Sequence, residues 1–278
     1  MNSATVVNEK VSLKTLSELM NLRGRVGVVT GGAGHLGQAY CEALVELGAD
    51  VCVLDVRADV AEQKAEELAR RYGTHCSAIA ADVTHEDEVA RAINEIVAVH
   101  GRLDILVNNA AYPRNDLPPD GSALTQQSLA QWKATLDVVL TGAFMMTRAC
   151  VPHLANGGQG VVVNVSSVYG LVGPDMRLYE GTDMQNPANY AAAKGGIVQL
   201  TRYLATTLAP KIRVNCIAPG GIWRGQAESF HQRYCSRTPL GRMGTEEDLK
   251  GVLAFLASDL SAYVTGQVML VDGGWTAW

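Results

Sequence analysis

Apolar strand-like runs alternate with helical segments along almost the whole chain, from Arg25 to the C-terminus. Each run is short and rich in Val, Ile and Leu, which is the composition of strands buried on both faces. Alternation of such strands with helices predicts a parallel sheet covered by helices on both sides. The predicted strands lie within 26–30, 51–55, 77–83, 103–111, 160–167, 212–220 and 266–274. The predicted fold class is a doubly wound, Rossmann-like α/β domain.

The helices between these strands are predicted from their end signals and their apolar spacing. Gly48 and Gly73 are typical of helix C-termini, and Thr84 is a candidate N-cap. The expected helices run from the first glycine-rich loop to Leu47, over 58–73, from Thr84 to about His100, and near 128–150 and 188–209. The stretches 112–125 and 170–189 are interpreted as inserted loops at the carboxyl ends of strands, where such loops usually form a ligand site.

No linker or shift in composition divides the chain, so we expect one dehydrogenase-sized domain over 25–278. Residues 1–24 form an N-terminal extension without the apolar core and cleavage site of a signal peptide. Its apolar residues have loosely helical spacing. We predict a short helix packed on the surface of the domain.

Composition argues against several classes of partner. The net charge of −5 and the lack of a basic, aromatic-interleaved run disfavour nucleic acid. We find no apolar run near the ~20 residues that span a bilayer, so we expect no membrane partner. The six cysteines are scattered, without C-x-x-C, which predicts reduced core thiols, no metal site and a cytoplasmic protein.

The stretch "TGGAGHLG" (30–37) follows the first strand and opens a helix, which is the context of a dinucleotide-binding loop. Gly31, Gly34 and Gly37 allow a tight turn and a close approach of backbone N–H groups to a pyrophosphate. Asp55 ends the second strand, 18 residues after Gly37, where its carboxylate would accept hydrogen bonds from the adenosine ribose and repel a 2′-phosphate. We therefore favour NAD over NADP. A tight turn without a ligand remains the alternative.

A possible acid/base pair lies in "YAAAK", where Tyr190 and Lys194 share one face of a helix. The lysine ammonium would lower the tyrosine pKa from about 10 toward the working pH, which suits a general acid/base for a hydroxyl proton. Ser167 ends "NVSS" after an apolar strand and would hold a substrate oxygen. An ordinary surface pair and a serine turn are the alternatives.

Taken in order, these motifs resemble the short-chain dehydrogenase/reductase family over about 25–275. The resemblance includes "ADV" (81–83), "NNAA" (108–111), "NCIAPGGI" (215–222) and "VTGQVMLVDGG" (264–274). It implies hydride transfer at a carbinol or carbonyl carbon and a homotetramer, or else a homodimer. Implied catalytic residues are Ser167, Tyr190 and Lys194. Implied cofactor-binding residues are Gly31, Gly34, His35, Leu36, Gly37, Asp55, Asp82, Val83, Asn109, Ala110, Ala111, Tyr190, Lys194, Pro219, Gly220 and Ile222.

Four positions depart from the family pattern. His35 stands where a glycine is usual, a spacing otherwise typical of longer sugar-nucleotide epimerases and dehydratases; it either contacts the phosphate or faces solvent. Val139 replaces an asparagine that helps to hold a proton relay. Arg224 replaces a threonine and is either an anion clamp or a solvated side chain. Ser167 and Tyr190 are 23 residues apart, where about a dozen is usual, and the segment between them partly resembles members of bacterial surface-sugar pathways.

The sequence predicts an NAD-dependent oxidoreductase acting on a small molecule. Polyhydroxylated compounds such as sugars or cyclitols are the favoured substrates, because polar and aromatic residues crowd the predicted rim of the site. These residues are Tyr112, Arg114, Asn115, Asp116, Arg177, Tyr179, Glu180, Trp223, Arg224 and His231. An epimerase or dehydratase with tightly bound NAD, and a non-catalytic NAD sensor, are the alternative functions.

Overall fold

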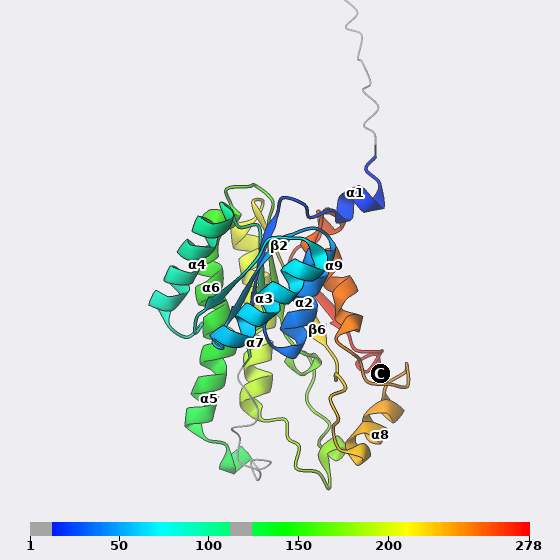
Figure 1. Cartoon of the computed structure of the whole chain (residues 1–278). Helices are drawn as coiled ribbons and strands as arrows, with labels where there is room; N and C mark the ends of the chain where they lie inside the picture. The colour runs from blue at the N-terminus through cyan, green and yellow to red at the C-terminus, as the bar shows by residue number, and fades with distance from the viewer. Residues whose placement is uncertain (1–12, 112–123) are drawn as a thin grey trace, which may run out of the picture.

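The computed structural model describes residues 13–111 and 124–278, and a parallel sheet forms its centre (Figure 1). The strand order is β3-β2-β1-β4-β5-β6-β7, so the order reverses between β1 and β4. In a sheet of this kind the crevice at the reversal, at the carboxyl ends of the strands, is the usual ligand site. The strands are β1 Val26–Thr30, β2 Asp50–Asp55, β3 Cys76–Ala80, β4 Ile105–Asn108, β5 Gly160–Val165, β6 Ile212–Pro219 and β7 Val268–Val271. The predicted doubly wound fold is confirmed.

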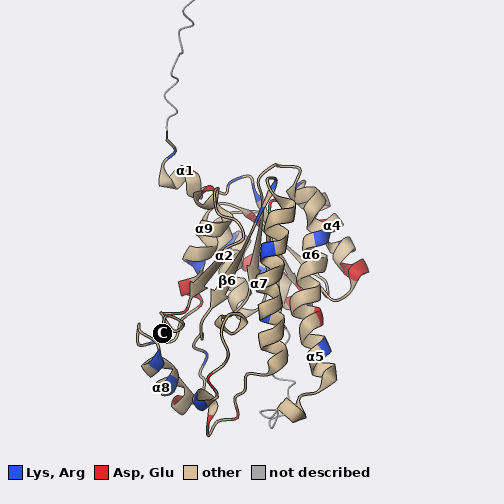
Figure 2. Ribbon diagram, turned by 180° about the vertical axis from the view of Figure 1, so that it is seen from behind, with Lys and Arg blue, Asp and Glu red and all other residues tan. Residues whose placement is uncertain are grey.

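Two apolar cores lie on opposite faces of the sheet because neighbouring strand residues point to opposite sides. Val29 and Val53 pack under α2 (His35–Glu46), α3 (Ala58–Tyr72) and α9 (Lys250–Ala257). Val28 and Leu54 pack under α4 (Glu86–His100), α6 (Gly142–Leu154) and α7 (Ala188–Leu208). Figures 1 and 2 show these two helical layers from opposite sides of the sheet.

Gly73 ends α3 as predicted, and Gly101, which was not predicted, ends α4 in the same way. Gly73 follows α3 with φ +70° and Gly101 follows α4 with φ +75°, and each N–H donates to a carbonyl four residues earlier. The predicted N-cap of α4 is wrong by one residue. The N-cap is His85, and the Thr84 hydroxyl instead donates to Asp82 Oδ1 at 2.7 Å, so Thr84 closes a local turn.

Two helices were not predicted: α8 (Glu228–Arg237) and α9. Helix α8 is mostly polar and buries only Phe230 and Tyr234. Two buried rings are too few to produce a periodic apolar signal. Helix α9 is a short apolar run of eight residues, which periodicity alone does not distinguish from a strand.

The N-terminal extension forms the expected short helix, α1 (Leu16–Met20), which Thr15 and Glu18 cap reciprocally. The helix contacts the 3₁₀ turn at Asp259–Ser261 but buries none of its residues, and Leu16 is exposed. Among the described residues, counted from Leu13, the first fully buried one is Leu22, which packs in the core under α2. The core therefore begins just before the first strand.

A continuous helix runs over Leu129–Leu154 and comprises α5 (Leu129–Leu136), a π-helical turn (Asp137–Thr141) and α6. Its length and mean hydropathy of 1.3 would allow it to cross a membrane, which the sequence analysis did not anticipate. Met146, Cys150 and Leu154 are nevertheless buried against the sheet, as expected of a core helix. The π-helical turn matters more for function, because such turns are frequent at functional sites.

Candidate active site

The glycine loop joins β1 to α2 at the reversal point of the sheet. Gly31 has φ +60°, and a Cβ atom there would lie 3.0 Å from the Cα atom of Ala110. A Cβ atom on Gly37 would overlap the carbonyl oxygen of Gly31. Both glycines are therefore required for the loop to close, whereas position 35 is the exposed first residue of α2 with ordinary helical backbone, so a histidine fits there.

The amino end of α2 is open towards the crevice. Its N-cap is Gly34, which has no side chain and therefore makes no side-chain capping hydrogen bond. The first N–H groups of a helix have no partner within the helix and attract anions. Leu36, in contrast, packs its side chain partly against the core, so only its backbone faces the loop. The loop thus has the shape and polarity that a pyrophosphate needs.

Asp55 lies at the carboxyl end of β2 and is 5% exposed. Its Oδ2 accepts a hydrogen bond from the Ala33 N–H of the glycine loop at 3.2 Å. Its Oδ1 accepts from the backbone N–H of Arg57 at 3.1 Å and from Arg57 Nε at 3.2 Å. The side-chain hydrogen bond to Asp55 raises the pKa of the half-exposed Arg57 guanidinium. Arg57 is therefore the ion-pair partner of Asp55.

Residues after β3 and β4 line the same crevice. Asp82 Oδ1 accepts from the N–H of Thr84 at 2.8 Å, and Val83 is buried beside Gly142. Asn109 Nδ2 donates to the carbonyl oxygens of Thr30 and Gly31, at 2.9 and 3.1 Å. The Ala110 N–H donates to the Thr30 hydroxyl, while Ala111 is exposed. The chain after β4 is therefore fastened to the glycine loop by hydrogen bonds.

The Tyr190–Lys194 pair lies in the first two turns of α7. Lys194 is 4% exposed, and its Nζ donates to the carbonyl oxygen of Val165, the last residue of β5, at 2.7 Å. The same Nζ lies 5.9 Å from the centroid of the Tyr190 ring. A buried ammonium next to a half-buried phenol is an arrangement that favours the phenolate.

The two serines after β5 have different environments. The Ser166 hydroxyl donates to the backbone oxygen of Lys194 at 2.8 Å and so ties β5 to α7. Ser167 is 6% exposed, and its Oγ accepts from the N–H of Tyr169 at 3.2 Å as the N-cap of a 3₁₀ turn. The Ser167 O–H is not used as a donor in that bond, so it stays available for a substrate oxygen.

Three buried polar side chains, Asn108, Asn164 and Thr201, form a chain of hydrogen bonds that was not predicted from the sequence. Asn108 Nδ2 donates to Asn164 Oδ1 at 2.9 Å, and Asn164 Nδ2 donates to the Thr201 hydroxyl at 2.9 Å. Val139, on the π-helical turn, lines a small hollow together with Asn108. Asn108 Oδ1 is buried and has no hydrogen-bond partner within residues 13–111 and 124–278. Val139 stands where the family pattern has an asparagine, and the amide of Asn108 on β4 is a polar group of the same kind beside it.

The segment after β6 closes the crevice on the other side. The Gly220 N–H donates to the Val271 carbonyl, and a Cβ atom on Gly220 would lie 2.8 Å from the Cα atom of Asp272. Pro219 is the last residue of β6, and Ile222 forms a bridge with Gly244. The Gly221 N–H donates to the Tyr234 hydroxyl at 2.6 Å, and burial raises the pKa of Tyr234 to about 12.

The long segment between Ser167 and Tyr190 packs against α8, and we call the two together the substrate-side cover (170–189 and 228–237). Tyr179 is buried against Phe230, with ring centroids 5.2 Å apart, and therefore does not belong to the predicted polar rim. Arg237 pairs with Asp175, and Trp275 lies beneath both parts. Bonding to Arg177 lowers the pKa of Asp175 to about 2.

The rest of the predicted rim has mixed outcomes. Trp223 and His231 are in ring contact, with centroids 4.1 Å apart, and Trp223 is 39% exposed. Arg224 Nε donates to Glu246 Oε1 at 3.2 Å. Arg224 is therefore neither a purely solvated side chain nor a free anion clamp, the two alternatives that the sequence left open. The predicted rim residues Tyr112, Arg114, Asn115 and Asp116 lie outside the described residues, which resume at Leu124 near the end of the first inserted loop.

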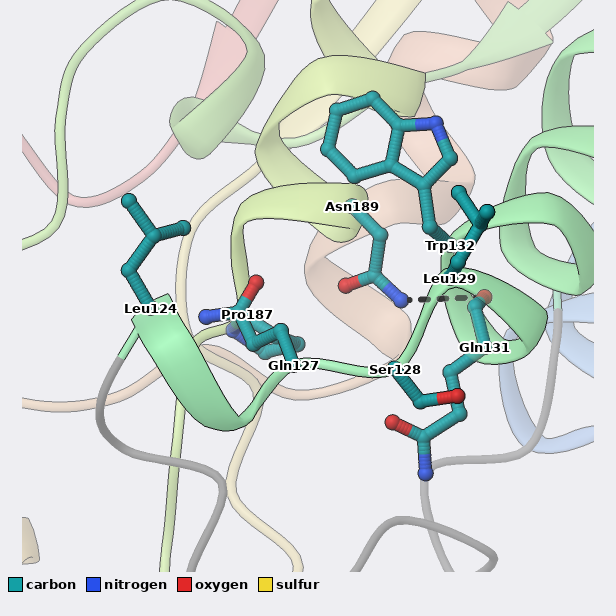
Figure 3. Close-up of a pocket in the computed structure, with 8 residues that line it drawn as sticks. All are labelled: Leu124, Gln127, Ser128, Leu129, Gln131, Trp132, Pro187 and Asn189. Atoms are coloured by element: carbon teal, nitrogen blue, oxygen red, sulfur yellow. Dashed lines mark hydrogen bonds between the residues drawn. The ribbon is translucent and has the colours of Figure 1, made fainter.

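A hollow of about 180 Å³ borders the start of α7 (Figure 3). Asn189 Nδ2 donates across it to the Gln131 carbonyl at 3.2 Å and to the Thr135 hydroxyl at 2.9 Å. Asn189 Oδ1 accepts from the N–H of Tyr190 at 2.9 Å. These bonds fix the first turn of α7, and with it Tyr190, against α5. The hollow is lined by Leu124, Gln127, Ser128, Leu129, Gln131, Trp132, Pro187 and Asn189.

Comparisons with known proteins agree with this geometry. A family model described as enoyl-(acyl carrier protein) reductase matches residues 31–276. The 3-oxoacyl-(acyl-carrier-protein) reductase of Aquifex aeolicus is 34% identical over 260 residues, covering 92% of this chain and 98% of that protein. The cis-4-hydroxycyclohexanecarboxylate dehydrogenase of Sinomonas cyclohexanicum is 36% identical over 258 residues, covering 91% and 97%.

A solved structure supports the same conclusion. The gluconate 5-dehydrogenase of Burkholderia cenocepacia J2315, in complex with NADP and tartrate, is 30% identical with a TM-score of 0.84. The match covers 94% of this chain and 99% of that chain. The motifs, the fold and these relatives together assign the chain to the short-chain dehydrogenase/reductase family, whose members are NAD(P)-dependent oxidoreductases acting on CH–OH groups.

Proposed function

We propose that the protein is an NAD-dependent dehydrogenase that oxidises a secondary hydroxyl group of a cyclic or polyhydroxylated compound. The observation that carries the proposal is the buried Lys194 ammonium, held by the Val165 carbonyl 5.9 Å from the Tyr190 ring at the carboxyl end of β5. A positive charge kept there, away from water, favours the ionised phenol that proton abstraction needs.

Each residue of the pair has a distinct task in this proposal. Tyr190 takes the proton of the substrate hydroxyl, or returns it in the reverse direction. Ser167 donates its free O–H to the substrate oxygen and keeps that oxygen near the phenol. Lys194 stabilises the phenolate and holds the nicotinamide ribose. Bound NAD supplies the hydride acceptor.

The glycine loop, the open end of α2 and Asn109 to Ala111 form a cradle that fits a dinucleotide. Because Gly31 has no side chain, it can lie close to Ala110, and the loop backbone could then come close to a pyrophosphate. Asp82 and Val83 border the adenine, and Pro219, Gly220 and Ile222 cover the nicotinamide side. His35, at the exposed start of α2, faces solvent beside the phosphates.

The preference for NAD rests on the Asp55 carboxylate. It is buried at the end of β2, where it accepts from the glycine loop itself, and it would repel a 2′-phosphate. Arg57 opposes this preference because its half-exposed guanidinium pairs with Asp55 and could face a phosphate. Since one related structure holds NADP, the preference must be measured rather than assumed from the family.

The substrate class is suggested by two aromatic rings, Trp223 and His231 of α8. The rings are in contact and tilted by 35° to each other, and aromatic surface of this kind suits the apolar face of a sugar or a cyclitol ring. Two relatives are named for a hydroxycyclohexanecarboxylate and for gluconate, both of which carry a hydroxyl and a carboxylate. The reductases named for 3-oxoacyl-(acyl-carrier-protein) make an acyl thioester the main competing substrate class.

The protein is also proposed to be a cytoplasmic homo-oligomer, by preference a tetramer. Leu129, Trp132 and Phe144 expose apolar surface on the long helix, and Leu270 does so on the edge strand β7. An exposed apolar edge strand promotes association unless something covers it. Light scattering of the purified chain measures the mass directly.

The experiment measures activity on a panel of substrates at neutral to alkaline pH, with NADH absorbance as the readout. The panel contains cyclitols, sugar acids, hydroxycyclohexanecarboxylates and, in the reverse direction, a 3-oxoacyl thioester, each with NAD and with NADP. We expect turnover on a ring hydroxyl with a kcat/KM for NAD at least tenfold above that for NADP. Turnover on the thioester alone would overturn the substrate class, and equal or higher efficiency with NADP would overturn the cofactor preference.

A further inference from the structure

Three metal-binding side chains meet at the edge of the sheet opposite the candidate active site. Asp50 is the first residue of β2, His75 precedes β3, and His100 is the last residue of α4. One ligand atom of each lies within 4.8 Å of the others, and the two imidazole rings are 4.5 Å apart. The parallel pairing of β2 with β3 brings Asp50 and His75 together, and the packing of α4 on the sheet adds His100, although each residue is 25 positions from the next.

The two ring nitrogens of His100 differ. Its Nε2 lies 2.7 Å from the Ser77 hydroxyl, whereas its buried Nδ1 has no hydrogen-bond partner among the residues that the structure describes. A buried, unpaired ring nitrogen is uncommon in proteins. When Nε2–H donates to Ser77, Nδ1 carries a lone pair that can bind a metal ion, as in metal sites where a second group orients a histidine ligand.

Asp50 is also oriented towards the other two residues. Its Oδ1 accepts the backbone N–H of His75 at 2.9 Å, which fixes both the carboxylate and the start of the His75 loop. Within residues 13–111 and 124–278, no lysine or arginine forms an ion pair with Asp50. The carboxylate therefore keeps its charge for a ligand in the cluster.

We propose that Asp50, His75 and His100 bind one divalent transition-metal ion, with Zn²⁺ as the reference case. Two imidazoles and one carboxylate are a ligand set for Zn²⁺, Co²⁺ or Ni²⁺ rather than for Mg²⁺ or Ca²⁺. Bonds of about 2.0–2.2 Å require ligand atoms roughly 3.3 Å apart, so the side chains must move together slightly. Water completes the coordination.

The ion joins the end of α4 to the starts of β2 and β3. This edge of the sheet is far along the strands from Tyr190, so the bound metal has a structural role. It stabilises the adenine-side half of the domain because a ligand that binds only the folded state raises its stability. No metal site was expected because the cysteines are scattered without C-x-x-C, and the three residues proposed here are too far apart in the sequence to form a short motif.

The test uses the untagged full-length chain, stripped with EDTA and titrated with Zn²⁺ by calorimetry. We expect one ion per chain. His75→Ala, His100→Ala and Asp50→Asn should each weaken binding at least tenfold, whereas His153→Ala, a histidine outside the cluster, should bind as the wild type does. Unchanged affinity in His100→Ala, or a loss in His153→Ala equal to that in His100→Ala, would overturn the site.

A second measurement needs no variant. X-ray absorption at the zinc edge of the loaded wild type should show two imidazole ligands and oxygen ligands. Zn²⁺ at about 100 times its Kd should raise Tm by about 5 °C in the wild type. Absence of imidazole ligation, or a Tm rise of the same size in His100→Gln, would contradict the proposal even if an alanine variant fails to fold.

Discussion

The two halves of the candidate active site are held together in different ways. On the cofactor side, backbone meets backbone: Gly31 approaches Ala110, Gly37 packs on Gly31, and Asn109 bonds the loop carbonyls. On the substrate side, side chains hold 170–189 to α8, through the pair of Arg237 with Asp175 and through aromatic contacts.

This difference teaches which parts of an active site leave a trace in sequence. A backbone contact at van der Waals distance excludes every residue except glycine, so it fixes residue types at fixed spacing. Side-chain contacts between 170–189 and α8 can be made by many combinations of residues. The cofactor half therefore leaves a recognisable motif in the sequence, whereas the substrate half does not.

The largest expected effect is the loss of the ring beneath the cover. Trp275 is 2% exposed and contacts Tyr169 and Tyr234 at 5.7 and 5.9 Å between ring centroids. Trp275→Ala should lower the free energy of unfolding by about 3–5 kcal/mol, because it leaves a large cavity. Urea denaturation measures this change. Trp223→Ala, which removes a ring that is 39% exposed, should cost under about 1 kcal/mol, and equal losses would refute a distinct core under the cover.

The next effect addresses the cofactor half. Gly37→Ala places a methyl group on the Gly31 carbonyl and displaces the loop, so kcat/KM for the dinucleotide should fall about 100-fold. Gly251→Ala is the matched control, since nothing lies within 4 Å of a Cβ atom there. If Gly37→Ala binds dinucleotide normally by fluorescence titration, the loop does not depend on backbone packing.

A smaller effect concerns the ion pair of the cover. Asp175→Asn removes the charge that faces Arg177 and Arg237. Hydrogen exchange in 170–189 should therefore become about fivefold faster, which corresponds to a loss of roughly 1 kcal/mol in the free energy of local opening. The Asp175 pKa is lowered to about 2 in the folded chain. Its stabilisation is therefore complete above the unfolded value of about 3.9 and declines as the pH falls towards 2. If Asp175→Asn loses as much protection from exchange between pH 5 and pH 3 as the wild type does, Asp175 is not the titrating group.

The smallest effect is expected at Arg224. Because its guanidinium already pairs with Glu246, Arg224→Ala should change KM for an anionic substrate less than about threefold. A tenfold rise in KM, with kcat unchanged, would restore the anion clamp that the sequence suggested.

The fold and the cofactor side could be predicted because periodic apolar strands and glycine spacing are local signals. Gly31, Asp55 and the pair Tyr190 and Lys194 were found in this way. Other features depend on residues that are distant in sequence. Asn108 meets Asn164 across 56 positions, and Asp50 meets His100 only through the packing of α4 on the sheet.

Errors on the substrate side have the same physical origin. Tyr179 was placed on a polar rim because loops are usually exposed, yet α8 covers it. Helix α8 itself went unpredicted, since only Phe230 and Tyr234 among its residues are buried. Where a loop becomes part of a core, only the packed structure reveals which of its residues face inwards.

The central claim is that the Tyr190 phenol transfers the substrate proton beside the buried Lys194. The most direct measurement is the single-turnover rate of NADH formation in Tyr190→Phe on the substrate found in the panel. We predict a rate 10²- to 10⁴-fold below wild type, with cofactor affinity within threefold, while Tyr203→Phe on the exposed face of the same helix reacts as wild type. A Tyr190→Phe rate within threefold of wild type would contradict the account.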